Sequence, residues 1–184
     1  MTTVVIMAAG LGTRMKSRTP KLLHQVCGRP MLAYVIDAAR EATGSPPLVV
    51  YSRHTAAICD VFAGEADFVL QDDPRGTADA VRVALGVLPA DTADIAVING
   101  DIPLIEASLI ADLIAVRQEE QAVVAILTID AVDPTGLGRV VRDDDDRVRY
   151  VVEEKDATEE ERQIEEIRTW APVCGASIIR PPPM

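Results

Sequence analysis

Glycines and basic residues are concentrated in one loop near the start of the chain. An apolar run, Val4–Ile6, leads into this loop, whose notable members are Ala8, Ala9, Gly10, Gly12, Arg14 and Lys21. Glycines at a strand end let backbone N–H groups approach phosphate oxygens closely. Arginine can bind a phosphate through two N–H groups, and lysine adds a compact charge. The loop therefore indicates a site for a triphosphate that loses pyrophosphate.

Two glycines alone would favour a tight strand-to-helix turn over a phosphate site. The loop matches neither the GxGxxG dinucleotide fingerprint nor the GxxxxGK[ST] phosphate loop. Arg14 and Lys21 are what favour a phosphate site, whereas Lys16 and Arg18 are expected to be solvated. Pro20 fixes the backbone directly before Lys21.

Further polar residues follow other apolar runs. Asp101 comes after Ile95–Ile98, and Gln71 follows Phe68–Leu70. If these runs are parallel strands, both residues lie at the sheet edge where α/β folds bind ligands. A carboxylate there can hold Mg²⁺ against phosphates, although a lone Asp after a strand is also a common turn or cap residue. Gly76 and Thr77 equally fit a helix N-terminus that Thr77 caps.

The elements that must position these residues alternate along the chain. Val- and Ile-rich runs predict strands at Val4–Ala8, Leu48–Tyr51, Phe68–Leu70, Ile95–Ile98 and Val123–Thr128. Helical periodicity predicts helices at Met31–Ala42, Ala56–Phe62, Ala78–Val87 and Ser108–Glu119. This alternation predicts an α/β fold, Rossmann-like, with a mostly parallel sheet flanked by helices.

The pattern changes after Asp130. Strands are predicted at Arg139–Arg142 and Val148–Val152, a short acidic helix at Thr158–Gln163, and a third short strand at Val173–Ile179. We expect a single domain over residues 1–184, with a core over 1–130 and a small β-rich lid insertion over 131–179. The run Asp143–Asp146 lacks the alternating ligands of a calcium loop and is expected to be a solvated hairpin tip.

Composition limits the classes of function. The chain has 184 residues and a net charge of -11, yet its first 36 residues contain five basic residues and no Asp or Glu. We therefore expect no nucleic-acid partner, and one region prepared for a small anion. Three scattered cysteines suggest neither disulfides nor zinc and fit a cytoplasmic protein. No signal peptide or membrane span is expected.

Several motifs in order carry a resemblance to a known family. The opening AAGLGTRMKSRTPKLLHQVCGRPML closely resembles the signature of sugar nucleotidyltransferases, in particular the uridylyltransferase domain of bifunctional GlmU enzymes. Further matching segments are Gln71 with Arg75–Ala78, Asn99–Leu104, Asp133–Arg139 and Val152–Thr158. The resemblance covers nearly the whole chain to about Thr169 and implies the nucleotide-diphospho-sugar transferase fold.

The resemblance also implies an activity. The chain would transfer uridylyl from UTP to N-acetylglucosamine-1-phosphate with Mg²⁺, giving pyrophosphate and UDP-N-acetylglucosamine, a cell-wall precursor. Arg14 and Lys21 would be catalytic and Asp101 would hold the metal. Residues implied to contact the nucleotide are Ala8, Ala9, Gly10, Gly12, Gln71, Gly76 and Thr77. Those implied to surround the sugar are Gly138, Glu153 and Arg168.

The chain departs from the family in two respects. It has Glu166-Ile-Arg-Thr-Trp170 where the family has Glu-Ile-Asn-Thr-Gly, so Arg168 replaces a short amide facing the sugar. We also expect the domain to be incomplete at its C-terminal end, without an acetyltransferase β-helix domain, and to form a monomer or weak homo-oligomer. Two alternatives therefore stay open: a catalytically impaired nucleotide-binding fragment, or a nucleotidyltransferase for another sugar phosphate or nucleotide.

Overall fold

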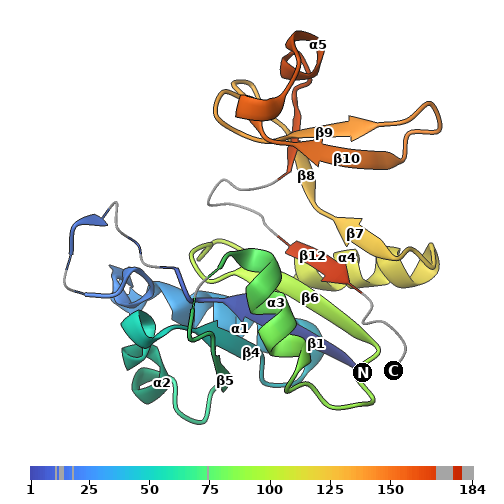
Figure 1. Cartoon of the computed structure of the whole chain (residues 1–184). Coiled ribbons are helices and arrows are strands. Elements are labelled where there is room, and N and C mark those ends of the chain that lie inside the picture. Colours follow the sequence, from blue (N-terminus) through green and yellow to red (C-terminus); the bar gives the residue numbers. More distant parts are fainter. Residues whose placement is uncertain (11, 13–14, 18, 74, 169–175, 180–184) are drawn as a thin grey trace.

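The architecture was obtained as a computed structural model, shown in Figure 1. It describes residues 1–10, 12, 15–17, 19–73, 75–168 and 176–179, with only the backbone given for Arg168 and residues 176–179. Two sheets dominate it. A six-stranded sheet forms the body, and a four-stranded antiparallel sheet stands beyond one end of it.

The main sheet has the strand order β5-β4-β1-β6-β12-β7. Its first four strands run parallel, and β12 runs antiparallel to both of its neighbours. The strands are β1 (Thr2–Met7), β4 (Leu48–Tyr51), β5 (Asp67–Leu70), β6 (Asp94–Asn99), β7 (Val124–Ile126) and β12 (Ala176–Ile179). The predicted α/β class with a mostly parallel sheet is confirmed.

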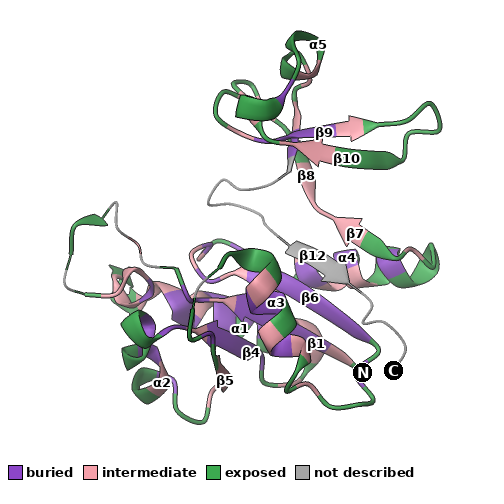
Figure 2. Cartoon of the chain, in the orientation of Figure 1, coloured by how far each residue is buried: buried purple, intermediate pink, exposed green. Residues whose placement is uncertain are grey.

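Helices cover both faces of this sheet. They are α1 (Met31–Thr43), α2 (Ala57–Val61), α3 (Thr77–Leu85) and α4 (Ala107–Glu119). Successive side chains of β1 point to opposite faces of the sheet, so the strand contributes to both layers of the core. Val4 and Ile6 pack with α1, α2 and α4, whereas Val5 packs with α3 on the opposite face. Figure 2 shows β1, β4 and β6 as largely buried. None of the described helices is long and apolar enough to cross a membrane.

The predicted strand Val123–Thr128 is wrong as a single element. It divides into β7 in the main sheet and β8 (Thr128–Asp130) in the smaller sheet, with Leu127 between them. The predicted strand at Val173–Ile179 corresponds to β12, which lies in the main sheet and not beside the lid strands. Residues 173–175 lie outside the described part of the chain.

The smaller sheet has the order β10-β9-β11-β8. It contains β9 (Arg139–Arg142) and β10 (Val148–Val152), both as predicted, and β11 (Glu166–Arg168), which the sequence pattern did not reveal. Between β10 and β11 lie η4 (Glu154–Asp156) and α5 (Glu159–Arg162). Thr158 caps α5 by accepting a hydrogen bond from the Glu161 backbone N–H, and the Glu161 carboxylate accepts one from the Thr158 backbone N–H.

Short elements complete the fold near the opening loop. They are η2 (Lys21–Leu23), β2 (Gln25–Val26), β3 (Arg29–Pro30) and η3 (Arg53–Thr55). The turn between β2 and β3 uses positive φ at Cys27 and Gly28, 49° and 81°, as two-residue hairpins require. This ribbon links η2 directly to the start of α1.

Candidate active site

A cavity of about 490 Å³ lies at the carboxyl ends of the parallel strands. It is bounded by the ends of β1, β5 and β6, by the opening loop, and by the first turn of α3. The described residues that line it are Met7, Ala8, Ala9, Gly10, Gly12, Lys21, Leu22, Gln71, Gly76, Thr77, Ala80, Asn99 and Asp101. Segments as far apart in sequence as Met7 and Asp101 thus meet at one sheet edge, as doubly wound sheets require.

Packing beneath the cavity fixes the position of Lys21. Leu22 is 5% exposed and belongs to the core beside α1. A Cβ added at Gly100 would lie 3.1 Å from Leu22 Cδ1 and 3.1 Å from the Met7 carbonyl oxygen. A larger residue at this position would therefore require Leu22 or the backbone at Met7 to shift by a few tenths of an ångström. The contact brings Asp101, the next residue, next to Lys21.

The Lys21 ammonium group donates a hydrogen bond to the Asp101 carboxylate and forms an ion pair with it. Both side chains are about one-third exposed, at 36% and 33%. The described lining of the cavity therefore includes one cation and one anion, which neutralise each other and still face solvent. Each could instead meet a ligand group of opposite charge.

Gly12 packs against the aliphatic part of the Lys21 side chain. Its φ is +58°, and an added Cβ would lie 2.9 Å from Lys21 Cβ. The glycine is therefore needed both for its left-handed backbone and for the space beside Lys21. Apart from its chain neighbours, no described residue has an atom within 4 Å of the Cβ position of Gly10, and Gly10 lines the cavity.

Gln71 forms the opposite wall. It is 2% exposed, and its backbone N–H donates to the Tyr51 carbonyl at 2.7 Å. Its side-chain Nε2 donates to Asp79 Oδ2 at 2.7 Å and to the Gly76 carbonyl at 3.4 Å. The hydrogen bond from Gln71, followed by one from Arg82, lowers the pKa of the Asp79 carboxyl below its ordinary value.

The first turn of α3 borders the cavity next to Gln71. Gly76 has a φ of +105°, and Thr77 is exposed at the helix start. The Thr77 side chain makes no capping hydrogen bond in this structure, and Gly76 occupies the cap position. The alternative in which Thr77 caps the helix is therefore wrong. Backbone N–H groups at the start of a helix have no partner within the helix, so this turn can contribute hydrogen-bond donors to the cavity.

The residues expected near a sugar lie on the smaller sheet. A Cβ added at Gly138 would lie 3.3 Å from the Val152 carbonyl oxygen and 3.5 Å from Glu153 Oε2, so the structure brings Gly138 and Glu153 together. Neither is among the described residues that line the cavity. Arg168 lies in β11, paired with Thr128, and its side chain falls outside the described part.

A buried cation supports this second cluster. The Arg139 side chain is 3% exposed and pairs with Glu154 at 3.0 Å, while Glu154 accepts the Gly136 backbone N–H at 2.6 Å. The hydrogen bond from Gly136, and after it the one from Arg139, lowers the pKa of Glu154. This pair holds the loop that contains Gly138 against the end of β10.

Nine of the thirteen predicted site residues line the one cavity: Ala8, Ala9, Gly10, Gly12, Lys21, Gln71, Gly76, Thr77 and Asp101. Arg14 lies outside the described residues. Sequence reasoning named Asn99 and Gly100 only as part of a matching segment, without a role, and it missed Asp79. The position of Asn99 could have been found, because it ends β6 directly opposite Met7 of β1. Nothing in the local pattern marks Asp79.

The oxygen donors of the cavity fit a magnesium ion. Asp101 supplies a carboxylate and Asn99 an amide oxygen, both of the hard type that Mg²⁺ prefers. The described residues contain no group of three or more His, Cys, Asp or Glu side chains placed to hold a metal. A site of this kind suits Mg²⁺, which keeps waters and is usually completed by substrate phosphates.

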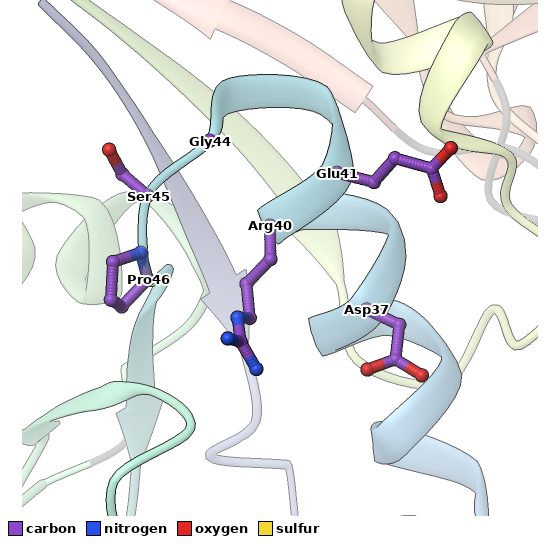
Figure 3. A pocket seen from close by; sticks show the side chains of 6 residues that line it. All are labelled: Asp37, Arg40, Glu41, Gly44, Ser45 and Pro46. Carbon is purple, nitrogen blue, oxygen red and sulfur yellow. The ribbon is translucent and has the colours of Figure 1, made fainter.

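A second hollow of about 360 Å³ lies elsewhere on the surface, and Figure 3 shows it. Its lining comes from the last turns of α1 and the turn that follows, and includes Arg40, Glu41 and Gly44. Because β4 begins just beyond this turn, the hollow lies at the amino end of that strand. It is therefore at the sheet edge opposite the cavity.

A mostly parallel sheet with a glycine-lined cavity at its carboxyl edge is typical of a nucleotide-binding α/β domain. Residues 4–167 match the MobA-like NTP transferase domain family, and the chain belongs to this family.

Comparison with individual proteins agrees with this membership. The chain is 42% identical over 166 residues to the bifunctional protein GlmU of Lactobacillus delbrueckii subsp. bulgaricus and 44% identical over 167 residues to that of Pseudomonas aeruginosa. Each alignment covers 90% of this chain and 36% of the relative, so the chain spans about a third of the length of these curated relatives.

A solved structure shares the fold. The UDP-glucose pyrophosphorylase crystallised with UDP-glucose superimposes with a TM-score of 0.74 at 17% identity, over 98% of this chain and 76% of that one.

Proposed function

We propose that the chain catalyses transfer of a uridylyl group from UTP to N-acetylglucosamine-1-phosphate, in the presence of Mg²⁺. The observation that carries the proposal is the meeting of Gly12, Lys21 and Asp101 in one cavity with the Gln71 wall. Identity above 40% to GlmU proteins over most of the chain supports the choice of nucleotide and sugar phosphate.

The chemistry requires positioning more than proton transfer. A phosphate oxygen of the sugar phosphate attacks the α-phosphorus of UTP, the bond to the β-phosphate bridging oxygen breaks, and pyrophosphate leaves with the electron pair. Because the attacking oxygen is already ionised near neutral pH, no general base is needed. The absence of His from the residues given above as lining the cavity is consistent with this reaction.

Lys21 would contact the α-phosphate as its charge redistributes, and Arg14 would stabilise the departing pyrophosphate. Backbone N–H groups of Ala9 and Gly10 would bind phosphate oxygens. Asp101, with Asn99 beside it, would hold Mg²⁺, which neutralises triphosphate charge when bound. Lys21 is already positioned by Leu22 and Gly12, so this part of the site is organised before substrate binds.

The smaller sheet would supply the sugar side of the site. Glu153 is exposed beside Gly138 and would accept hydrogen bonds from sugar hydroxyls. Arg168 would replace the family's short amide. We also propose that residues 1–184 act as a single domain with a lid region, in the cytoplasm, as a monomer or weak homo-oligomer.

The deciding experiment measures pyrophosphate release by the purified chain with UTP, Mg²⁺ and N-acetylglucosamine-1-phosphate. The matched variants are Asp101→Ala and Asp37→Ala, an exposed ion-paired aspartate on α1. Release that requires Mg²⁺ and is lost only in Asp101→Ala supports the proposal. Binding of UTP without release would indicate a nucleotide-binding fragment, and release with another sugar phosphate or nucleotide would change the substrate.

A further inference from the structure

The Gln71 carboxamide is held in one orientation by its surroundings. An Asp carboxylate can only accept hydrogen bonds at neutral pH, so the Gln71 atom that faces Asp79 Oδ2 at 2.7 Å must be the NH₂ group. The Gly76 carbonyl, also only an acceptor, faces the same nitrogen at 3.4 Å. The amide orientation therefore follows from chemistry and does not depend on which terminal atom was named nitrogen.

This leaves the carbonyl oxygen of Gln71 as the group available to a ligand. Gln71 lines the cavity, and no described residue donates a hydrogen bond to its Oε1. The wall therefore presents an acceptor. Uracil carries an N–H donor at N3, whereas cytosine in the same pose carries a lone pair there, which would repel the oxygen.

Asp79 is well placed to enforce this arrangement without touching the ligand. It is not among the residues that line the cavity, and its side chain is 18% exposed. Its Oδ2 accepts a hydrogen bond from Gln71 Nε2, while its Oδ1 accepts one from the Arg82 guanidinium at 2.7 Å. The Arg82 side chain is 75% exposed, so its contact can be removed separately.

We propose that Asp79 is a positioning residue that orients the Gln71 carboxamide and thereby sets the preference for uracil over cytosine. The inference rests on the proposed uridylyl transfer. In this proposal Asp79, which does not line the cavity, controls base selection indirectly. Its carboxylate fixes the orientation of the Gln71 amide, and the Gln71 amide oxygen then selects a base with an N3–H donor.

The test measures binding of UTP and CTP, each with Mg²⁺, by titration calorimetry. In Asp79→Asn the side-chain amide can donate to Gln71 Oε1, which allows the carboxamide to reverse. We expect the UTP-over-CTP preference to fall roughly tenfold or more, the factor that about 1.4 kcal/mol represents. Arg82→Gln removes the outer ion pair alone and should keep the wild-type preference.

A double-mutant cycle separates orientation from a general structural effect. Gln71→Met should abolish the preference, and adding Asp79→Asn to it should change nothing further. The N-terminal turn of α3 also gains from an acidic residue. Losing this helix stabilisation would alter the melting temperature but would affect the binding of UTP and CTP equally. The ratio of their affinities is therefore insensitive to it. If Asp79→Asn does not fold, Asp79→Ser serves the same cycle.

The outcomes distinguish the two proposals. A wild-type chain that binds UTP in preference to CTP, with the same preference in Asp79→Asn, overturns the role of Asp79 and leaves uridylyl transfer standing. A wild-type chain without preference for UTP overturns both. Equal effects of Asp79→Asn in the presence and absence of the Gln71 side chain would also exclude the orienting role.

Discussion

The ammonium group of Lys21 is paired with the carboxylate of Asp101, 80 residues further along the chain. The pair joins the opening loop to the loop after β6, and it places the cation and the candidate metal ligand in direct contact. Binding of a triphosphate with a divalent cation would exchange this contact for two others. The metal and the nucleotide are therefore expected to support each other's binding.

Replacing Lys21 tests the cation. Lys21→Ala should lower turnover roughly a hundredfold or more, the loss expected when one preorganised electrostatic donor is removed. Lys16→Ala is the matched control, because Lys16 belongs to the same segment but is exposed and absent from the cavity lining given above. Steady-state pyrophosphate release gives the rates, and circular dichroism checks the fold. Equal turnover in the two variants would remove Lys21 from the mechanism.

Replacing Asp101 tests the exchange of partners. In Asp101→Asn the charge of Lys21 is no longer neutralised, so UTP binding in EDTA should stay the same or strengthen by up to about fivefold, as expected for a partly exposed pair. The gain in affinity that Mg²⁺ gives the wild type should disappear. Titration calorimetry with EDTA and with Mg²⁺ measures both. Asp37→Asn, which breaks the exposed pair with Arg29, should behave as wild type.

Gly12 offers a test of positioning. Gly12→Ala introduces strain at a φ of +58° and places a methyl group 2.9 Å from Lys21 Cβ. We expect turnover to fall at least about tenfold, since small displacements of catalytic groups have large effects. The control Gly44→Ala has a similar φ of +69°, but no described residue other than its chain neighbours lies within 4 Å of the added carbon. If both variants lose stability alike and keep full turnover per folded molecule, Lys21 placement does not depend on Gly12.

A buried ion pair far from the cavity should control stability alone. The Asp94 and Arg117 side chains are 7% and 6% exposed and form an ion pair between the start of β6 and the end of α4. Asp94→Ala leaves an unpaired buried cation and should lower the free energy of unfolding by about 3–5 kcal/mol. Urea denaturation measures the change.

The paired replacement provides the control for that prediction. Asp94→Leu combined with Arg117→Met removes both charges and should be more stable than Asp94→Ala, since no charge is left unpaired. Activity per folded molecule should be unchanged, because the pair lies at the sheet edge opposite the cavity. A double variant no more stable than the single one would contradict this account.

The smaller sheet should be sensitive to acid. The pKa of Glu154 lies below its ordinary value of 4.5 because the folded chain donates the Gly136 N–H and the Arg139 guanidinium to it. Stability from this group is therefore complete above about pH 4.5 and is lost as the pH falls through the lower folded pKa. Urea unfolding at pH values from about 7 to about 3 should show a shallower decline in Glu154→Gln than in the exposed-site variant Glu160→Gln.

The sequence predicted most of the body of this fold, because its strands and helices repeat with clear periods. The placement of Asp101 at the same sheet edge as the opening loop was also expected, since the carboxyl ends of parallel strands share one edge, but its contact with Lys21 was not. Which strands pair with one another was harder to predict from the sequence. The run Val123–Thr128 has one continuous apolar pattern, yet its two halves pair with different sheets, and local periodicity carries no information about that choice.

Some residues at the candidate site could be predicted from the sequence, and others could not. Gly10, Gly12 and Gln71 were found because glycine and strand-end residues mark a ligand edge. Asp79 was not, because its role depends on a hydrogen bond formed only when α3 docks beside β5. The role of Gly100 was missed for a similar reason, as its close approach to Leu22 appears only once both loops are in place.

The placement of β12 has a consequence for how the chain matures during synthesis. Within the described part of the chain, β7 has no main-sheet neighbour other than β12, which begins 50 residues after the end of β7. Until then the edge of β6 is unpaired, and the apolar strand β7 has nothing to join. A nascent chain at this stage exposes two strand edges able to pair with another copy. Release from the ribosome before residue 179 would therefore favour aggregation, and chaperone binding should concentrate on that interval.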